Sequence, residues 1–203
     1  MSIHVYADES WFPDHTIQTV GIIWWSAYVC DELRAKISQI TTKYTAPDIK
    51  WSRIRAKKKL FLCAKELLIS GYDRLQSAWW VWISVYIWWS VQELYKKFFD
   101  DLTKSWSTLF YFYPDKNLTL KRHTDQHIFT RDERFLRVQP ILMRDEPLLI
   151  FADILAGMYR EYAERPEIFK QEKPSSYMPD FYKIALRRAW NTLNQHVPRE
   201  FFI

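Results

Sequence analysis

Three aspartates lie at positions where the local sequence pattern suggests that their carboxylates could bind a ligand or take part in catalysis. Asp8 ends a short alternating run, Asp115 follows an aromatic run, and Asp153 lies inside an apolar stretch. Carboxylate oxygens that are brought together suit Mg²⁺ or Mn²⁺ better than zinc. Two such ions about 3.5–4 Å apart activate water and stabilise the leaving oxygen when a phosphodiester is cleaved. Hydrolysis of a nucleic acid backbone is therefore the chemistry that these residue types favour.

Asp153 is the most informative of the three, because the residues around it in Leu149–Ala156 are apolar. A helix there would hold its carboxylate against the core, where an ionised Asp is costly unless it is paired or bound to a metal. Gly157 removes a side chain where another group can approach closely, at about 1 kcal/mol of helix stability. The simpler alternative is a buried Asp paired with Arg144 or Arg160, or bonded to the backbone.

Asp8 closes the run Ile3–Ser10, in which apolar residues alternate with polar or aromatic ones. A period of two predicts a strand. A carboxylate at the end of such a strand lies where ligands usually meet α/β folds. The alternative is that Asp8-Glu9-Ser10 only opens a solvated turn, because Asp and Ser are favoured there. This short stretch, taken alone, favours the turn.

The elements that must position these acids predict a mixed sheet flanked by helices in one α/β domain, residues 1–203. Runs rich in β-branched and aromatic residues predict the further strands Ile17–Ala27, Ala78–Trp89, Thr108–Tyr113 and Arg134–Met143. Apolar residues three and four apart predict the helices Cys30–Tyr44, Ser52–Ser70, Val91–Ser105, Leu148–Glu161 and Pro179–Leu193.

Some of these elements carry more specific expectations. Ile17–Ala27 is expected to form a hairpin with the first strand. Ala78–Trp89 lacks charge and is expected near the sheet centre, buried on both faces. Gly71 is expected to stop the second helix. Pro140 would confine Arg134–Met143 to a sheet edge or a bulge, and Asp145-Glu146-Pro147 should open the late helix.

The composition is globular, aromatic-rich and mildly basic. Hydrophobic residues make up 48% and charged residues 26%, which excludes a disordered chain. The net charge of +5 fits a nucleic acid partner without requiring one. The 11 Trp residues predict a bulky core, a protein-partner or homo-oligomer surface, or rings on which bases stack. Composition does not separate these three.

The cysteines and the hydropathy of the chain indicate the cellular location to expect. Cys30 and Cys63 belong to no CxxC pair, so a disulfide framework or a structural zinc site is not expected. A reducing cytoplasm is the simplest location. Ala78–Trp89 is too short to span a bilayer as a helix, which takes about 20 residues. We therefore expect no membrane association.

A cluster of positive charges opens the second expected helix. Arg53, Arg55, Lys57, Lys58 and Lys59 fall within seven residues. Such a cluster suits contacts with phosphate groups. A charge run is equally typical of a solvated helix face, and the two interpretations stand about even.

Three segments together resemble the DUF3800 family. They are Asp8-Glu9-Ser10 after a hydrophobic strand, Ile49-Lys50-Trp51 after the first helix, and Ala152–Gly157, with the sequence Ala-Asp-Ile-Leu-Ala-Gly, in a late helix. That family has the ribonuclease H-like fold and is generally regarded as containing metal-dependent nucleases. The resemblance implies that Asp8, Asp115 and Asp153 are catalytic metal ligands for Mg²⁺ or Mn²⁺. It adds Glu9 as a fourth ligand. Lys50 and Trp51 match a signature whose role the resemblance does not supply; contact of Lys50 with phosphate is our own expectation, and packing is the simpler role for Trp51.

Two positions depart from the family pattern. Trp11 stands where Gly usually follows Asp-Glu-Ser, and Ile150 stands where a Gln often precedes Ala-Asp. Either change could accompany lost activity. A catalytically inactive nucleic-acid-binding module therefore remains an alternative, as does an aromatic-rich protein-interaction or oligomerisation subunit.

Overall fold

The strands and helices whose bounds the structure describes occur in blocks along the chain: two strands, three helices, three strands and a last helix. This computed structural model describes residues 2–10, 18–46, 49–54, 57–75, 79–84, 95–96, 98–100, 109–115 and 132–164. In chain order, the elements are β1 (Ser2–Ser10), β2 (Gln18–Ser26), α1 (Ala27–Lys43), α2 (Trp51–Ile54), α3 (Lys58–Leu75), β3 (Trp79–Ser84), β4 (Leu109–Pro114), β5 (Phe135–Val138) and α6 (Leu149–Glu164).

The strands form one five-stranded mixed sheet with β1 at its centre, in the order β3-β2-β1-β4-β5. β2 runs antiparallel to both of its neighbours, β1 and β3. On the other side, β4 runs parallel to β1, and β5 runs parallel to β4. The expected α/β class is therefore confirmed, with the acid-bearing first strand enclosed between two partners.

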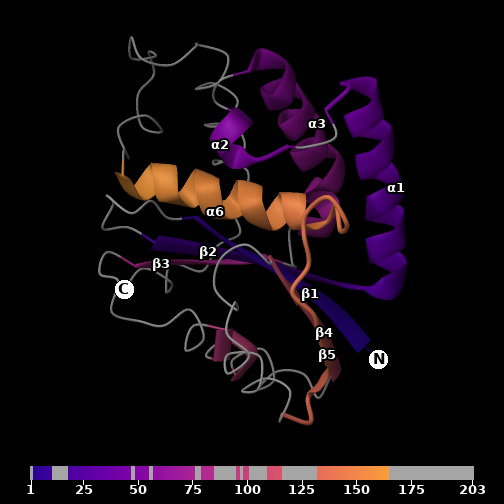
Figure 1. Cartoon of the computed structure of the whole chain (residues 1–203), viewed down its shortest axis with the longest axis vertical. Coiled ribbons are helices and arrows are strands. Elements are labelled where there is room, and N and C mark those ends of the chain that lie inside the picture. Colours follow the sequence, from indigo (N-terminus) through magenta and orange to yellow (C-terminus); the bar gives the residue numbers. More distant parts are fainter. Residues whose placement is uncertain are drawn as a thin grey trace.

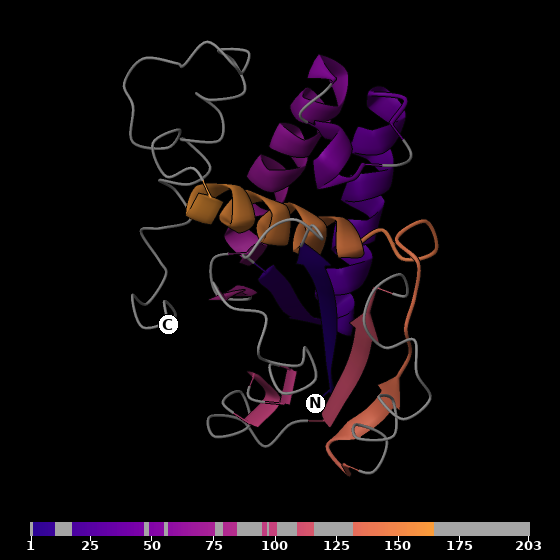
Figure 2. The ribbon, with the colours of Figure 1, turned by 60° about the vertical axis from the view of Figure 1, so that its left-hand side comes forward.

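Helices pack on both faces of the sheet. α6 lies across β1 and β2, and α1, α2 and α3 lie on the same side of the sheet (Figures 1 and 2). One hydrophobic cluster fills the space between the sheet and these helices. On the opposite face, helical residues 95–96 and 98–100 contribute Tyr95, Phe98 and Phe99 to a second hydrophobic cluster. β1 supplies side chains to both clusters, because successive residues of a strand point to opposite faces.

Two close approaches fix α6 between β2 and α2. Gly21 of β2 lies so near the helix that an added Cβ would collide with the carbonyl oxygen of Ala152. Gly157 lies under the indole of Trp51, and an added Cβ there would overlap that ring. Neither glycine has a positive φ, so each is required for space and not for backbone conformation.

Most expected strands are confirmed. Ile17–Ala27 appears as β2 in the expected hairpin, and Thr108–Tyr113 appears as β4. Arg134–Met143 contains the short strand β5, which occupies the end of the described sheet as Pro140 predicted. The helices Cys30–Tyr44 and Leu148–Glu161 are confirmed as α1 and α6.

Three more specific expectations are wrong. Ala78–Trp89 contains β3, which lies at one end of the described sheet and not at its centre, because β1 takes β2 and β4 as its two neighbours. Ser52–Ser70 is described as two helices, α2 and α3. Gly71 does not end α3, which continues to Leu75. Its φ is not positive, so it lacks the left-handed conformation of a C-terminal helix cap.

Several expectations fall partly or wholly outside the described residues. They include the helix Pro179–Leu193, most of Val91–Ser105, and Trp11. Within the described chain, Cys30 and Cys63 are free and buried. None of the described helices is both long and apolar enough to cross a lipid bilayer.

The contact between Gly157 and Trp51 generates a test of the packing. In an ordinary helix, Gly→Ala stabilises by about 1 kcal/mol. Here we expect Gly157→Ala to destabilise the protein by about 1–3 kcal/mol, because the new methyl group overlaps the indole. Urea denaturation measures the change. Combining it with Trp51→Leu, which makes room, should recover part of the loss; a stabilised Gly157→Ala single variant would contradict the contact.

Candidate functional site

The candidate site begins where β1 and β4 end side by side. Ala7 pairs with Pro114 in this parallel ladder, so the next residues, Asp8 and Asp115, are neighbours across it. The Asp115 N–H donates to the Ala7 carbonyl oxygen at 2.9 Å. Both aspartates are buried, with 3% and 5% of their surface exposed. Parallel pairing thus brings together two acids that are far apart in the sequence.

The side chains of these two aspartates lie on the same face of the sheet. Tyr6 and Tyr113 stack with their ring centroids 5.2 Å apart, so they share a face. Asp8 and Asp115 each follow two residues later on the same strands, and strand side chains repeat with a period of two. This is the face that α6 covers.

Asp153 is presented to this face from α6. It is partly buried, and its Oδ2 accepts a hydrogen bond from the Trp51 N–H at 2.5 Å. The same Trp51 packs its indole against Gly157, one turn further along α6. The segment Ile49-Lys50-Trp51 therefore orients Asp153, a role that its sequence did not reveal. The backbone bond considered as the simpler alternative is present.

The three aspartates lie close enough for their charges to affect one another. Burial raises the pKa of Asp8 well above its usual value, and the negative charges of Asp153 and Asp115 raise it further. Burial raises the pKa of Asp153 to about 6, although the hydrogen bond from Trp51 and the positive charge of Lys50 lower it. The three carboxylates repel one another, and a positive charge placed among them would relieve that repulsion.

Glu9 is directed away from this group. The Tyr95 hydroxyl donates to Glu9 Oε1 at 2.7 Å, and both side chains are buried. Tyr95 belongs to the hydrophobic cluster on the opposite face of the sheet, where it contacts the Phe112 ring edge-on. The predicted fourth ligand thus leaves β1 on the opposite face from Asp8, although its negative charge adds to burial in raising the pKa of Asp8. Alternation along β1 already separates Glu9 from Asp8.

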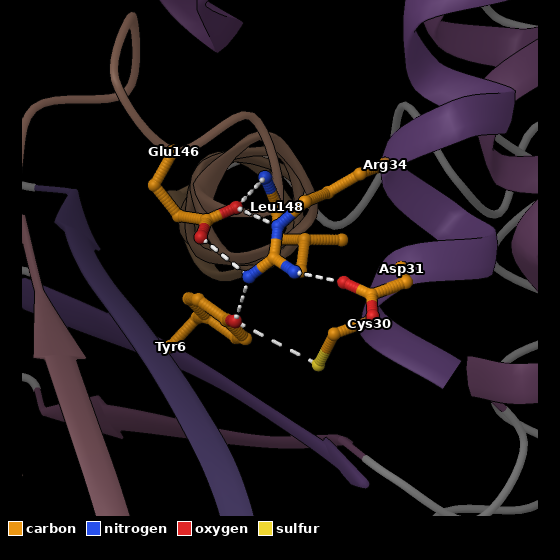
Figure 3. Close-up of polar contacts among 6 residues, drawn as sticks. All are labelled: Tyr6, Cys30, Asp31, Arg34, Glu146 and Leu148. Carbon is orange, nitrogen blue, oxygen red and sulfur yellow. Dashed lines mark hydrogen bonds and ion pairs between the residues drawn. The ribbon is translucent and has the colours of Figure 1, made fainter. Parts of the chain in front are cut away.

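A partly buried polar network holds the start of α6 against β1 and α1 (Figure 3). The Arg34 guanidinium donates to Glu146 through Nε at 3.1 Å and through Nη2 at 2.7 Å. It also donates to the Tyr6 hydroxyl at 2.9 Å and to Asp31 at 2.7 Å. Glu146 in turn accepts from the Leu148 N–H at 3.2 Å, in the turn that leads into α6. The sequence predicted that Asp145-Glu146-Pro147 opens this helix with Pro147 as its first residue, whereas α6 begins two residues later at Leu149. It carried no signal for the arginine partner of Glu146.

The basic cluster is only partly described. Arg53, Lys57 and Lys59 are exposed, and Lys59 Nζ donates to Thr45 Oγ1 at 3.0 Å. Arg55 lies outside the described residues, and the side chain of Lys58 is not described. Three exposed cations near α2 fit either interpretation, a phosphate-binding surface or a solvated face.

The donor chemistry of the three aspartates fits a hard divalent cation such as Mg²⁺ or Mn²⁺, because all of their ligand atoms are oxygen. The described residues contain no group of three or more His, Cys, Asp or Glu side chains that could hold a metal ion as they lie. The aspartates are therefore electrostatic neighbours and not a closed ligand shell. Binding of a cation would require their side chains to draw together.

Comparison with known proteins gives no further lead to the chemistry of this site. A scan against models of protein families matched none of them, and a search of curated proteins found no match.

The raised pKa of Asp153 predicts how stability depends on pH. The folded-state pKa of about 6 exceeds the unfolded value, so ionisation of Asp153 removes stability as pH rises through 6. At pH 7 and without divalent cations, Asp153→Asn should be more stable than wild type by on the order of 1–3 kcal/mol. The gain should shrink to a few tenths of a kcal/mol near pH 4, where the folded-state carboxyl is protonated and the unfolded-state carboxyl is about half ionised.

Urea denaturation at both pH values measures this difference. Asp145→Asn, which changes an exposed acid beside the same helix, is the matched control and should shift the unfolding free energy by no more than about 0.5 kcal/mol. A wild type as stable as Asp153→Asn at pH 7 would show that ionised Asp153 is not under electrostatic strain.

Proposed function

We propose that this protein is a ribonuclease H-like, DUF3800-like nuclease that uses Mg²⁺ or Mn²⁺ to hydrolyse nucleic acid phosphodiester bonds. The observation that carries the proposal is the convergence of three aspartates from β1, β4 and α6 on one face of the sheet. Burial raises the pKa of Asp8, and the negative charges of Asp153 and Asp115 raise it further, which supports a site that would be stabilised by a bound cation. The mixed sheet with helices on both faces supports the ribonuclease H-like fold.

In this proposal, Asp8, Asp115 and Asp153 hold the metal ions. Bound metal would activate the attacking water and stabilise the leaving oxygen. The protein supplies the rigid placement of the acids: the ladder between β1 and β4 fixes two of them, and Trp51 fixes the third. Lys50, whose charge acts on Asp153, lies where it can attract the phosphate backbone, and the exposed basic residues of the cluster around α2 extend that attraction.

Metal binding is the first test. Calorimetric titration with Mn²⁺ should show binding to wild type that Asp8→Asn and Asp153→Asn each abolish, because each substitution removes a charged ligand. Asp145→Asn is the matched control and should bind like wild type. Wild type that binds no Mn²⁺, even with nucleic acid present, would contradict the proposal.

Cleavage is the second test. Single- and double-stranded RNA and DNA are incubated with wild type and with Asp8→Asn in Mn²⁺, and the products are resolved by length. We expect the substitution, or EDTA, to lower the rate by about a hundredfold or more, since metal stabilisation of the transition state is worth several kcal/mol. Salt-dependent binding without cleavage and without sensitivity to EDTA would instead favour the inactive binding module. A stable oligomer with no affinity for nucleic acid would favour the protein-interaction subunit.

A further inference from the structure

A buried arginine connects the two elements that carry Asp8 and Asp153. Arg160 lies on α6 with 3% of its surface exposed. Its Nη1 donates to Ser10 Oγ at 2.6 Å, and its Nε lies 3.5 Å from Glu164 Oε1. A buried guanidinium is costly unless it is hydrogen-bonded and its charge is compensated. The position of Arg160 is therefore tightly defined by these partners.

The two ends of this link stand beside the two acids. Ser10 follows Asp8 by two residues on β1, so the two side chains share a face of the sheet. Arg160 follows Asp153 by two turns of α6, so they lie on the same stripe of the helix. The bond between Ser10 and Arg160 thus joins β1 to α6 close to Asp8 and Asp153, the two carboxylates that a metal ion would have to bridge.

A threonine of β2 adds a second connection at the same place. Thr19 pairs with Ser10 in the antiparallel ladder. Its hydroxyl lies 2.6 Å from the Ala156 carbonyl oxygen of α6 and 3.3 Å from the Ser10 carbonyl oxygen. Two hydrogen bonds therefore hold the end of β1 near α6: one from Thr19 of β2 to Ala156, and one from the Arg160 guanidinium to Ser10. The positive charge of Arg160 also lowers the pKa of Asp153, which places it within electrostatic reach of the acids.

We propose that Arg160 is a positioning residue of the candidate metal site: its bond to Ser10 holds β1 and α6 at the spacing from which the side chains of Asp8 and Asp153 can close on a divalent cation. The inference rests on the proposed function, because it concerns affinity for the same metal. It goes further by assigning a role to a residue outside the ligand set. Residues that orient metal ligands in this way typically contribute 10- to 100-fold to affinity.

The test compares Mn²⁺ affinity by calorimetric titration in full-length variants whose folding is checked by circular dichroism. The variants are Arg160→Gln, Arg160→Lys, Ser10→Ala and the double variant Ser10→Ala/Arg160→Gln. Arg134→Gln is the matched control, because Arg134 is also a partly buried arginine with acidic partners, Asp132 and Asp100. Wild type and Asp153→Asn are titrated in the same series.

We expect Arg160→Gln to weaken Mn²⁺ binding about tenfold or more. Arg160→Lys should recover part of the affinity, since it keeps the charge and a donor. Ser10→Ala should also weaken binding, and the double variant should bind no more weakly than Arg160→Gln, because both substitutions break one link. Arg134→Gln should change thermal stability without changing the affinity.

The outcomes separate this inference from the proposed function. Wild-type affinity in folded Arg160→Gln, or additive losses in the double variant, would overturn the positioning role while leaving the metal site intact. If Arg160→Gln does not fold, unchanged affinity in both Arg160→Lys and Ser10→Ala overturns the role. Absence of Mn²⁺ binding by wild type would overturn both the metal site and the role of Arg160.

Discussion

The burial of carboxylates on one face of the sheet, where they also repel one another, is the constraint that the rest of this structure must satisfy. Asp8 and Asp115 are buried next to each other, and Asp153 adds a third negative charge from α6. Each would gain solvation free energy by moving toward water. Their positions are kept because the backbone that carries them is fixed by interactions that do not involve the carboxylates. The rest of the fold supplies those interactions.

α6, which carries Asp153, is held along its length by different kinds of contact. The ion pair of Arg34 with Glu146 holds its start, close packing on Gly21 holds its middle, and the bond from Arg160 to Ser10 holds its later turns. The polar contacts fix the orientation of α6 about its axis, whereas the close packing fixes its distance from the sheet. Their combination leaves the helix little freedom to slide or rotate over the sheet.

The sequence predicted the parts of this arrangement that depend on local pattern. Alternation identified β1 and β2, and the apolar surroundings of Asp153 identified α6 as a helix with an acid on its inner side. Alternation also carried the information that Glu9 and Asp8 face opposite ways, although the family resemblance grouped them. Local pattern was misleading at Gly71, where a helix that packs well continues through a residue that often ends helices.

What could not be predicted depends on contacts between distant segments. The apolar run that contains β3 was expected at the sheet centre, yet it lies at one end of the described sheet because β4 pairs with β1. The spacing of residues along the sequence does not predict that Asp115 aligns with Asp8. Nor does it predict that Arg34 pairs with Glu146. Parallel pairing and helix docking are set by the packing of the whole domain.

The pairing of β1 has a consequence for the order in which the protein folds. β1 and β2 are joined as a hairpin, which closes a short loop and can form early. At that stage Asp8 is solvated and has no charged neighbour from the later part of the chain. Its neighbours arrive only when β4 aligns in parallel and α6 docks, steps that close long loops and are slow. The carboxylate repulsion therefore acts after the transition state for hairpin formation. It should oppose the later, slower docking of β4 and α6 and leave formation of the hairpin unaffected.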